Sequence, residues 1–510
     1  MIQTLSWKNR TAASGCGGDS RSGWAWWLLG IAALVPLLEA IARYPVHPVL
    51  IVSGGLALAG LAALVLDCPA WGACALILVV YWNVSDVLTE SWGFSWLLRL
   101  ALGGVLAAAG LRWLARAETA ERLRWPVAAA MLAYGASLAM AAVGAIDPAS
   151  AMAALMEFVK GAVIFYLVVN LLSRPRYWRW GVGALLAGAT LLALPVVYQG
   201  VSGSRNQLWG FGTMVYAEIV PGNKGWRLGG AIGDPNFLAL VLISALPIAL
   251  VGALDRGAHW GWRAANTVAA VLLLGATVFT YSRASLLGIA LVLAAVIYKY
   301  RRRRWLWAVA AVAMVAAVPL LPQGFRARIL TLDEASLTGQ QQQIGDMSFR
   351  IRRNAYLTGA LMFERHWLLG VGPGNYEANY LTYSAQVGLS GEAGVRDPHS
   401  LPIQVAAETG VVGIACFAIL LGLGFHEMER ARRRLRQLRA VRFADQIWGL
   451  ELALAAYLVL SIFLHGAFFR HFLLILALGT GGAGLVRIGR SRPDLAVSDS
   501  STGTAPAAGF

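Results

Sequence analysis

A polar stretch at residues 322–402 carries the side chains best suited to chemistry in this chain. Arg350, Arg352 and Arg353 lie close together in it, and His399 stands near its end. A guanidinium stays charged at any working pH, and its forked donors match the oxygens of a phosphate group. An imidazole of near-neutral pKa is the usual general base for a sugar hydroxyl. The stretch therefore predicts an acidic substrate beside a general base, with a solvated helix face and a structural histidine as the alternatives.

Two earlier segments also carry candidate ligands. Arg283 lies in a tight turn between two apolar runs, where it either binds a phosphate or extends to the membrane boundary. A glycine-rich segment at 226–236 holds Arg227, Asp234 and Asn236. Glycines let the backbone approach a ligand closely, and Asp234 suits the cap of the helix expected after it. This segment is either a substrate-binding loop or a re-entry turn with a helix cap.

Motifs for metal, nucleotide or thiol chemistry are missing from the sequence. No Asp-x-Asp pair, His-Glu-x-x-His helix or phosphate-loop lysine motif occurs. Metal-dependent glycosyl transfer, metalloproteolysis and ATP hydrolysis therefore lack their parts. The four cysteines show no metal-ligand spacing and predict neither a disulfide framework nor a zinc site. Glu157 and Lys160 share a helix face, where they can neutralise each other. We expect no metal and no cofactor.

The composition is that of a membrane protein. Of 510 residues, 58% are hydrophobic and 13% charged, against about 25% charged in soluble domains. The net charge of +16 would suit nucleic acid, but the basic residues fall in short clusters between apolar runs, which is how membrane proteins set their orientation. Nucleic-acid binding is therefore disfavoured.

The apolar runs predict an all-α polytopic membrane protein with about 12 to 14 transmembrane helices. With the N-terminus in the cytoplasm and alternating spans, most Lys and Arg fall on the cytoplasmic side. The arginines of 322–402 fall on the other side, so we expect them to bind substrate instead of setting orientation. The predicted spans are 24–42, 49–66, 69–83, 93–111, 126–146, 151–172, 180–200, 237–254, 264–280, 285–299, 305–321, 404–424, 447–465 and 468–487.

The predicted organisation follows from these spans. It comprises a cytoplasmic N-terminal segment at 1–23, a transmembrane domain at 24–321 with an outward loop at 202–236, a large outward loop at 322–403 that carries catalysis, C-terminal transmembrane helices at 404–487, and a disordered cytoplasmic tail at 488–510.

Over residues 225–415 the chain resembles the superfamily of O-antigen ligases and O-antigen polymerases. The pattern His399-Ser400-x9-Gly410-x-x-Gly413 is the most specific part of the likeness. The other parts are Arg283-x-x-x-Leu287, Arg352 four residues before Tyr356 (with Arg350 as a rival), Leu369-Gly370-Val371-Gly372 and Gly233-Asp234-Pro235-Asn236.

The resemblance implies a C-type glycosyltransferase-like membrane fold in the bacterial inner membrane, active on its periplasmic face without a metal. The donor would be a glycan on undecaprenyl pyrophosphate, and the acceptor a sugar of the lipid A core or a second lipid-linked glycan. His399 would accept the proton of the acceptor hydroxyl, or orient that hydroxyl, while Arg283 and Arg352 or Arg350 stabilise the departing diphosphate. Substrate binding is assigned to Arg227, Asp234, Asn236, Arg353 and Ser400.

Other activities stay open at this point. Within the superfamily, a ligase is slightly favoured over a repeat-unit polymerase, and a protein O-oligosaccharyltransferase is a further alternative, because shared motifs do not fix the acceptor. A transporter or flippase of lipid-linked sugars would show inverted repeats and a polar cavity at the membrane midplane. A structural membrane subunit would leave the clustered arginines without a role.

Overall fold

The computed structural model describes residues 68–93, 99, 101–106, 125–220, 223–303, 307, 347–388, 396–466, 469–482 and 486. The predicted spans 24–42 and 49–66, nearly all of 305–321, and the two terminal segments lie outside these residues. The chain divides into two compact units. One consists of Met1–Gly72 and Arg99–Thr119, and the other of Ala73–Leu98 and Ala120–Phe510. Every contact that builds the candidate site lies within the second unit.

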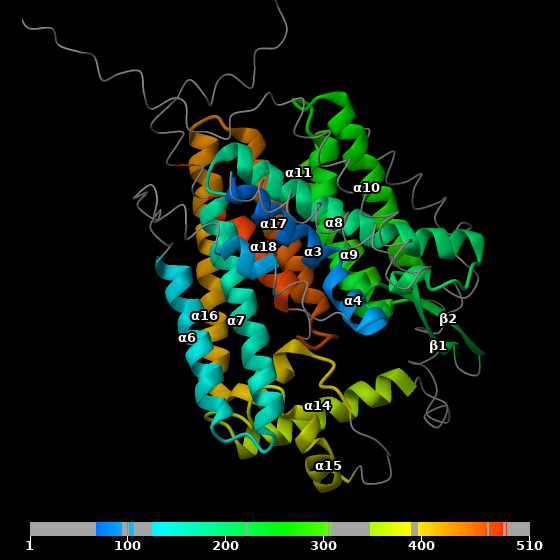
Figure 1. The fold of residues 1–510 in the computed structure, drawn as a ribbon, viewed down its shortest axis with the longest axis vertical. Coiled ribbons are helices and arrows are strands. Elements are labelled where there is room, and N and C mark those ends of the chain that lie inside the picture. Colours follow the sequence, from blue (N-terminus) through cyan, green and yellow to red (C-terminus); the bar gives the residue numbers. More distant parts are fainter. Residues whose placement is uncertain are drawn as a thin grey trace, which may run out of the picture. The chain divides into compact units, whose positions relative to one another are not determined.

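Helices dominate the described residues, as the apolar runs predict (Figure 1). They are α3 (Pro69–Tyr81), α4 (Val84–Trp92), α6 (Trp125–Ala142), α7 (Pro148–Leu171), α8 (Pro175–Ser202), α9 (Pro235–Leu254), α10 (Trp260–Phe279), α11 (Arg283–Lys299), α14 (Met347–Arg365), α15 (Tyr376–Gln386), α16 (Leu401–Gln437), α17 (Val441–Leu460) and α18 (Phe469–Gly481), with the short 3-10 helix η2 (Leu208–Gly210).

The protein is a multi-pass membrane protein by the length and apolar character of its helices. Within the described residues, six helices are long and apolar enough to cross a membrane, or up to seven if the bent pair of α3 and α4 counts as one span. Predicted spans that lie wholly within the described residues each coincide with an apolar helix. The total of about 12 to 14 spans stays a prediction, because several lie outside the described part.

Helix α9 forms the buried centre of the second unit. It packs against α8, α10, α11 and α17, and 89% of its most apolar stretch is buried. A helix that is apolar on all sides belongs in the interior of a bundle, and α9 follows that rule. The surrounding helices therefore hold the start of α9, and the turn before it, in a fixed position.

The only strands in the described residues form a β-hairpin in the predicted outward loop. Strand β1 (Thr213–Val220) pairs antiparallel with β2 (Asn223–Gly230), and Tyr216 faces Trp226 across the ladder. The hydropathy pattern does not predict these strands, because a two-stranded ribbon lacks the longer alternating runs of a larger sheet. Strand β2 delivers Arg227 to the candidate site.

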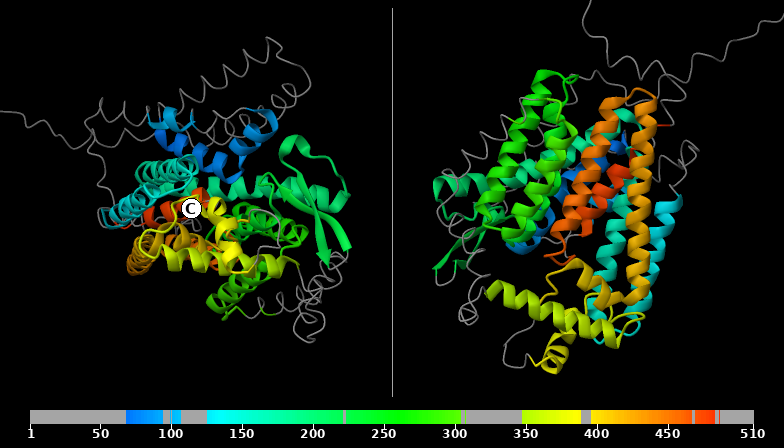
Figure 2. Two further views of the ribbon diagram at one scale, coloured as in Figure 1. Left: turned by 90° about the horizontal axis from the view of Figure 1, so that it is seen from below. Right: turned by 180° about the vertical axis from the view of Figure 1, so that it is seen from behind.

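Helices α14 and α15 cross the ends of α6, α7 and α16 (Figures 1 and 2). Their attachment depends on a kink in α16 at Gly410, where φ is 62° and ψ is −164°. The kink interrupts the hydrogen-bond ladder of the helix and leaves two amides and two carbonyls without helical partners. The segment 367–372 supplies hydrogen-bond partners for them. The four hydrogen bonds run from Val371 N to Ala407 O (2.9 Å), Gly372 N to Glu408 O (3.0 Å), Val411 N to Trp367 O (2.8 Å) and Val412 N to Leu368 O (3.3 Å).

The glycines of Gly370-Val371-Gly372 and Gly410 therefore have an architectural role. A Cβ on Gly410 would lie 2.4 Å from the carbonyl of Leu368, and one on Gly370 would lie 2.3 Å from the backbone of Glu408. Two chain segments approach each other too closely for any side chain at these positions. This contact fixes α14, with its arginines, relative to the start of α16.

Replacing Gly410 with alanine should destabilise the protein by about 3 kcal/mol or more, because only glycine readily adopts this backbone conformation and the added Cβ meets backbone atoms. The measurement is the midpoint of thermal unfolding in detergent. Gly422 is the matched control, since it lies on the same helix with nothing within 4 Å of an added Cβ. Gly422→Ala should keep or slightly raise the midpoint. Equal midpoints for the two variants would contradict the architectural role.

Two predictions from the sequence, one about an ion pair and one about the cysteines, have different outcomes. Glu157 and Lys160 form an ion pair along α7, which confirms that they neutralise each other. The expectation that the cysteines form no disulfide is wrong, because Cys68 is disulfide-bonded. Disulfide formation depends on how closely two chain segments approach in the fold, and spacing along the sequence carries no information about that approach.

Candidate functional site

Three arginines from separate elements meet at one end of the helices. Arg227 comes from β2, Arg283 is the first residue of α11, and Arg352 lies near the start of α14. Burial, reinforced by the charges of Arg352 and Arg283 and opposed by Asp234, lowers the pKa of Arg227 to about 10. Burial lowers the pKa of Arg352, and the charges of Tyr356 and Asp234 oppose the shift. All three guanidinium groups stay charged at neutral pH, so the cluster is strongly cationic.

Arg227 is also a structural link. Its Nε donates to the carbonyl of Thr280 (3.0 Å) and its Nη2 donates to Oδ1 of Asn236 (2.9 Å). The side chain is buried. It therefore ties β2 both to the turn that precedes Arg283 and to the first turn of α9. The sequence predicts Arg227 and Asn236 as substrate ligands, and in the structure they bind each other.

The glycine-rich segment after β2 is a tight turn that leads into a helix cap. Oδ1 of Asp234 accepts hydrogen bonds from the backbone amides of Asn236 (2.7 Å) and Phe237 (3.0 Å), at the start of α9. A Cβ on Gly229 would lie 2.1 Å from the carbonyl oxygen of Gly233. The segment thus has the geometry of the capped re-entry turn. The carboxylate of Asp234 lies near enough to raise the pKa of Arg227 and that of Arg352.

The turn before α11 holds Arg283 in a constrained position. Tyr281 has a φ of 53°, in the left-handed region that non-glycine residues seldom adopt. Ser282 is buried, its amide donates to Oγ1 of Thr280 (3.3 Å), and its carbonyl accepts from the hydroxyl of Ser285 (2.6 Å). Strained backbone of this kind persists where the surrounding structure enforces it, often at functional sites.

His399 stands beside the arginine cluster, just before α16. Its φ is 46°, again in the left-handed region. Its ring lies 5.9 Å from the ring of His465, centroid to centroid. Burial, followed by the neighbouring His465, lowers the pKa of His399 to about 4, while Asp397 opposes the shift. The charge of Arg352 also acts on the imidazole. His399 is therefore a neutral imidazole at neutral pH, able to accept a proton.

The remaining predicted site residues fall into different environments. Ser400 is buried and shares a hydrogen bond with Tyr356, which lies one turn after Arg352 on α14. Arg353 is exposed on α14. Arg350 belongs to the start of α14, and its side chain lies outside the described part of the structure. Among the described side chains of this helix, Arg352 is the arginine whose charge acts on both His399 and Arg283.

Helix ends add to the positive potential of the site. Helices α9, α11 and α16 begin next to Asn236, at Arg283 and next to His399, respectively. The N-terminus of a helix carries a partial positive charge and unpaired amides, which favour anions. Asp234 already caps the start of α9. The other two ends, together with three guanidinium groups, outweigh the nearby carboxylate of Asp397. The arrangement suits a multiply charged anion such as a diphosphate.

Sequence reasoning missed two carboxylates of this site. Asp397 lies 3.7 Å from Nε2 of His465, oxygen to nitrogen, and shares a hydrogen bond with Glu377 of α15. This hydrogen bond is the main cause that raises the pKa of Glu377 to about 7. The position of Asp397 two residues before His399 was a usable signal. Glu377 carried none, because its proximity depends on how α15 folds back.

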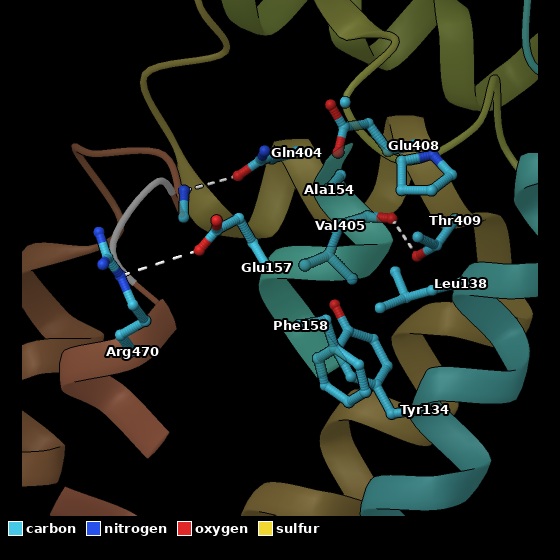
Figure 3. Close-up of a pocket in the computed structure, with 13 residues that line it drawn as sticks. Tyr134, Leu138, Ala154, Glu157, Phe158, Gln404, Val405, Glu408, Thr409 and Arg470 are labelled. Atoms are coloured by element: carbon cyan, nitrogen blue, oxygen red, sulfur yellow. Dashed lines mark hydrogen bonds and ion pairs between the residues drawn. The ribbon is translucent and has the colours of Figure 1, made fainter. Parts of the chain in front are cut away.

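A cavity of about 180 Å³ lies beside the loop that carries His465 (Figure 3). Gly466 of that loop lines the cavity and donates its amide to Oε1 of Gln404 (2.6 Å). The wall combines apolar and charged side chains from α6, α7, α16 and α18. Figure 3 shows the rings of Tyr134 and Phe158 on one side and the pair of Glu157 and Arg470, 3.9 Å apart, on another.

No three His, Cys, Asp or Glu side chains come together as metal ligands within the residues that the structure describes.

Comparison with known proteins agrees with this geometry. Residues 268–418 match the family model described as O-antigen ligase. The match spans Arg283, Arg352 and His399, and leaves out Arg227 and His465. No curated protein matches the chain at a significant level. Residues 268–418 therefore match an O-antigen ligase domain, a likeness that supports glycan transfer of the ligase or polymerase type, and the chain is a multi-pass membrane protein.

Proposed function

We propose that the protein transfers a glycan from undecaprenyl pyrophosphate to a sugar acceptor, on the periplasmic face of the bacterial inner membrane. The observation that carries the proposal is the meeting of Arg227, Arg283 and Arg352 beside His399, from four separate segments of the chain. Each of these segments contributes one group to a single cationic site, and a diphosphate is the leaving group that such a site stabilises best.

The chemistry requires one base and a stabilised leaving group. The acceptor oxygen attacks the anomeric carbon, and its proton passes to His399. The bond between the anomeric carbon and the diphosphate oxygen breaks, and the electron pair leaves with the diphosphate. Arg283 and Arg352 stabilise the added negative charge, which is worth most in a partly dry site that is already organised. A single displacement of this kind needs no second carboxylate.

The distribution of basic residues supports the proposed orientation. At the ends of the helices away from the site, Lys299 binds Asp445 (2.7 Å), Arg442 binds Asp255 (3.0 Å) and Arg179 lies over the ring of Phe443 (5.2 Å). This end is rich in Lys and Arg, which is typical of the cytoplasmic side. The site, with α14 and α15, then faces the periplasm, as we propose for the whole segment 322–403.

The substrates are distinguished by a glycolipid profile of a deletion strain. Loss of long chains on the lipid A core, with lipid-linked polymer accumulating, identifies a ligase, which we favour. Accumulation of single lipid-linked repeat units identifies a polymerase, and loss of glycans from proteins identifies a protein glycosyltransferase. An unchanged profile of all three glycan classes would overturn the proposal. Complementation with the wild-type gene, but not with an Arg283→Ala variant, assigns the change to this site.

A further inference from the structure

A second histidine, His465, lies against the proposed base. It comes from the loop between α17 and α18, far from His399 in the sequence, and the two rings meet edge to face at a centroid distance of 5.9 Å. The ring of Phe237, at the start of α9, packs edge-on against His465 at 4.8 Å. Nε2 of His465 lies 3.7 Å from Oδ1 of Asp397. His465 thus lies close to both the proposed base and a carboxylate.

The loop that carries His465 is fastened on both sides. Its hydrogen bonds join it to the start of α16 and to α14, so the position of His465 relative to His399 is built into the fold. They run from Leu401 N to Ser461 O (2.8 Å), from the hydroxyl of Tyr356 to Ile462 O (2.9 Å), and from Gly466 N to Oε1 of Gln404 (2.6 Å).

The charges around this pair come from every neighbouring element. The segment before α16 contributes Asp397, α14 contributes Arg352, and the turn before α9 contributes Asp234. Helix α15 contributes Glu377, which shares a hydrogen bond with Asp397. Nδ1 of His465 is buried without a hydrogen-bond partner among the described residues. In His465, Nε2 therefore lies beside a carboxylate, and Nδ1 makes no hydrogen bond within the described residues.

We propose that His465 positions His399 and relays its proton, through the carboxyl pair of Asp397 and Glu377, to the solvent. The relay depends on the proposed glycan transfer. In each turnover the acceptor proton moves to His399 as the new glycosidic bond forms, and then along His465 and Asp397 to the carboxylate of Glu377, which releases it to water. His399 returns to the neutral form that the next turnover needs.

The properties of the groups along this path agree with a relay. Burial lowers the pKa of His465 as well as that of His399, so neither imidazole retains a proton at neutral pH. Burial acts to raise the pKa of Asp397, but the hydrogen bond with Glu377 and the two histidines bring it below its ordinary value. Glu377, whose pKa is raised to about 7, is the last group and is exposed to solvent. A proton therefore moves outward along the path.

The test uses His465→Gly in full-length protein, with glycan transfer followed in detergent or proteoliposomes. We expect kcat to fall by about tenfold to a hundredfold with an unchanged KM for the donor, which is less than the loss of a direct base. Added imidazole should restore kcat. Pyrazole, a ring of the same shape but a far weaker base, should not. Equal rescue by both compounds, or an unchanged kcat, would show that His465 only fills space.

A second variant covers the case in which His465→Gly does not fold. His465→Gln keeps a hydrogen-bonding side chain of similar size but cannot carry a proton, so a relay predicts the same loss of kcat and a packing role predicts wild-type kcat. His366→Gln is the control, because His366 is an exposed histidine just after α14 that binds Tyr383 instead of this cluster (2.6 Å). If the wild-type protein transfers no glycan, the proposed function fails and the relay with it; an active wild type with an active His465→Gln variant overturns the relay alone.

Discussion

Replacing Arg283 with alanine is expected to lower the rate of glycan transfer by a factor of about 10² to 10³ while the protein still inserts into the membrane. Arg283 opens α11 next to a strained Tyr281, and the charge of Arg352 acts on it directly. In the proposed reaction, it lies where negative charge develops on the departing diphosphate. The measurement is kcat with a polyprenyl-diphosphate glycan donor, alongside the amount of protein in the membrane.

Arg283→Lys separates charge from geometry. Lysine keeps the positive charge but lacks the planar fork that binds two phosphate oxygens at once. We therefore expect a transfer rate between the rates of the alanine variant and the wild type. Arg365→Ala is the matched control, since Arg365 is exposed at the far end of α14. Wild-type rates for Arg283→Ala and Arg283→Lys would remove Arg283 from the site.

Replacing His399 with alanine or glutamine is expected to lower kcat by a factor of about 10² to 10⁴, the usual contribution of a positioned base. In the wild type, kcat/KM should stay constant from neutral pH downward and fall only as the pH drops through about 4, where His399 becomes protonated. The sign follows from the role, because only the neutral imidazole accepts a proton.

The pH dependence also distinguishes the free from the loaded enzyme. A bound diphosphate places negative charge near His399 and so raises its pKa, which means that kcat should begin to fall at a higher pH than kcat/KM does. The His399→Gln variant should lose this limb altogether. A limb that persists in the variant would assign the titration to another group, and His366→Gln should reproduce the wild-type profile.

The candidate site was only partly predictable. Arg283, Arg352 and His399 were found because their residue types and spacing resemble a known family, and the structure brings these three together. For Asp234, the helix cap expected as an alternative is present. Arg227 was expected to bind substrate, and the structure gives it protein partners on both sides. The contact between His465 and His399 has no signal in the sequence, because it joins segments far apart in the chain.

Local sequence patterns are enough to identify the class of the protein and the positions of its helices in the chain. Hydropathy is a property of consecutive residues, so apolar runs reveal helices such as α9 directly. The sequence also shows which residue types are available for binding a diphosphate. Only the tertiary structure decided which of them meet, and it gave Gly410 an architectural role through contact with Leu368. Such contacts join segments far apart in the chain, and they depend on how the helices pack.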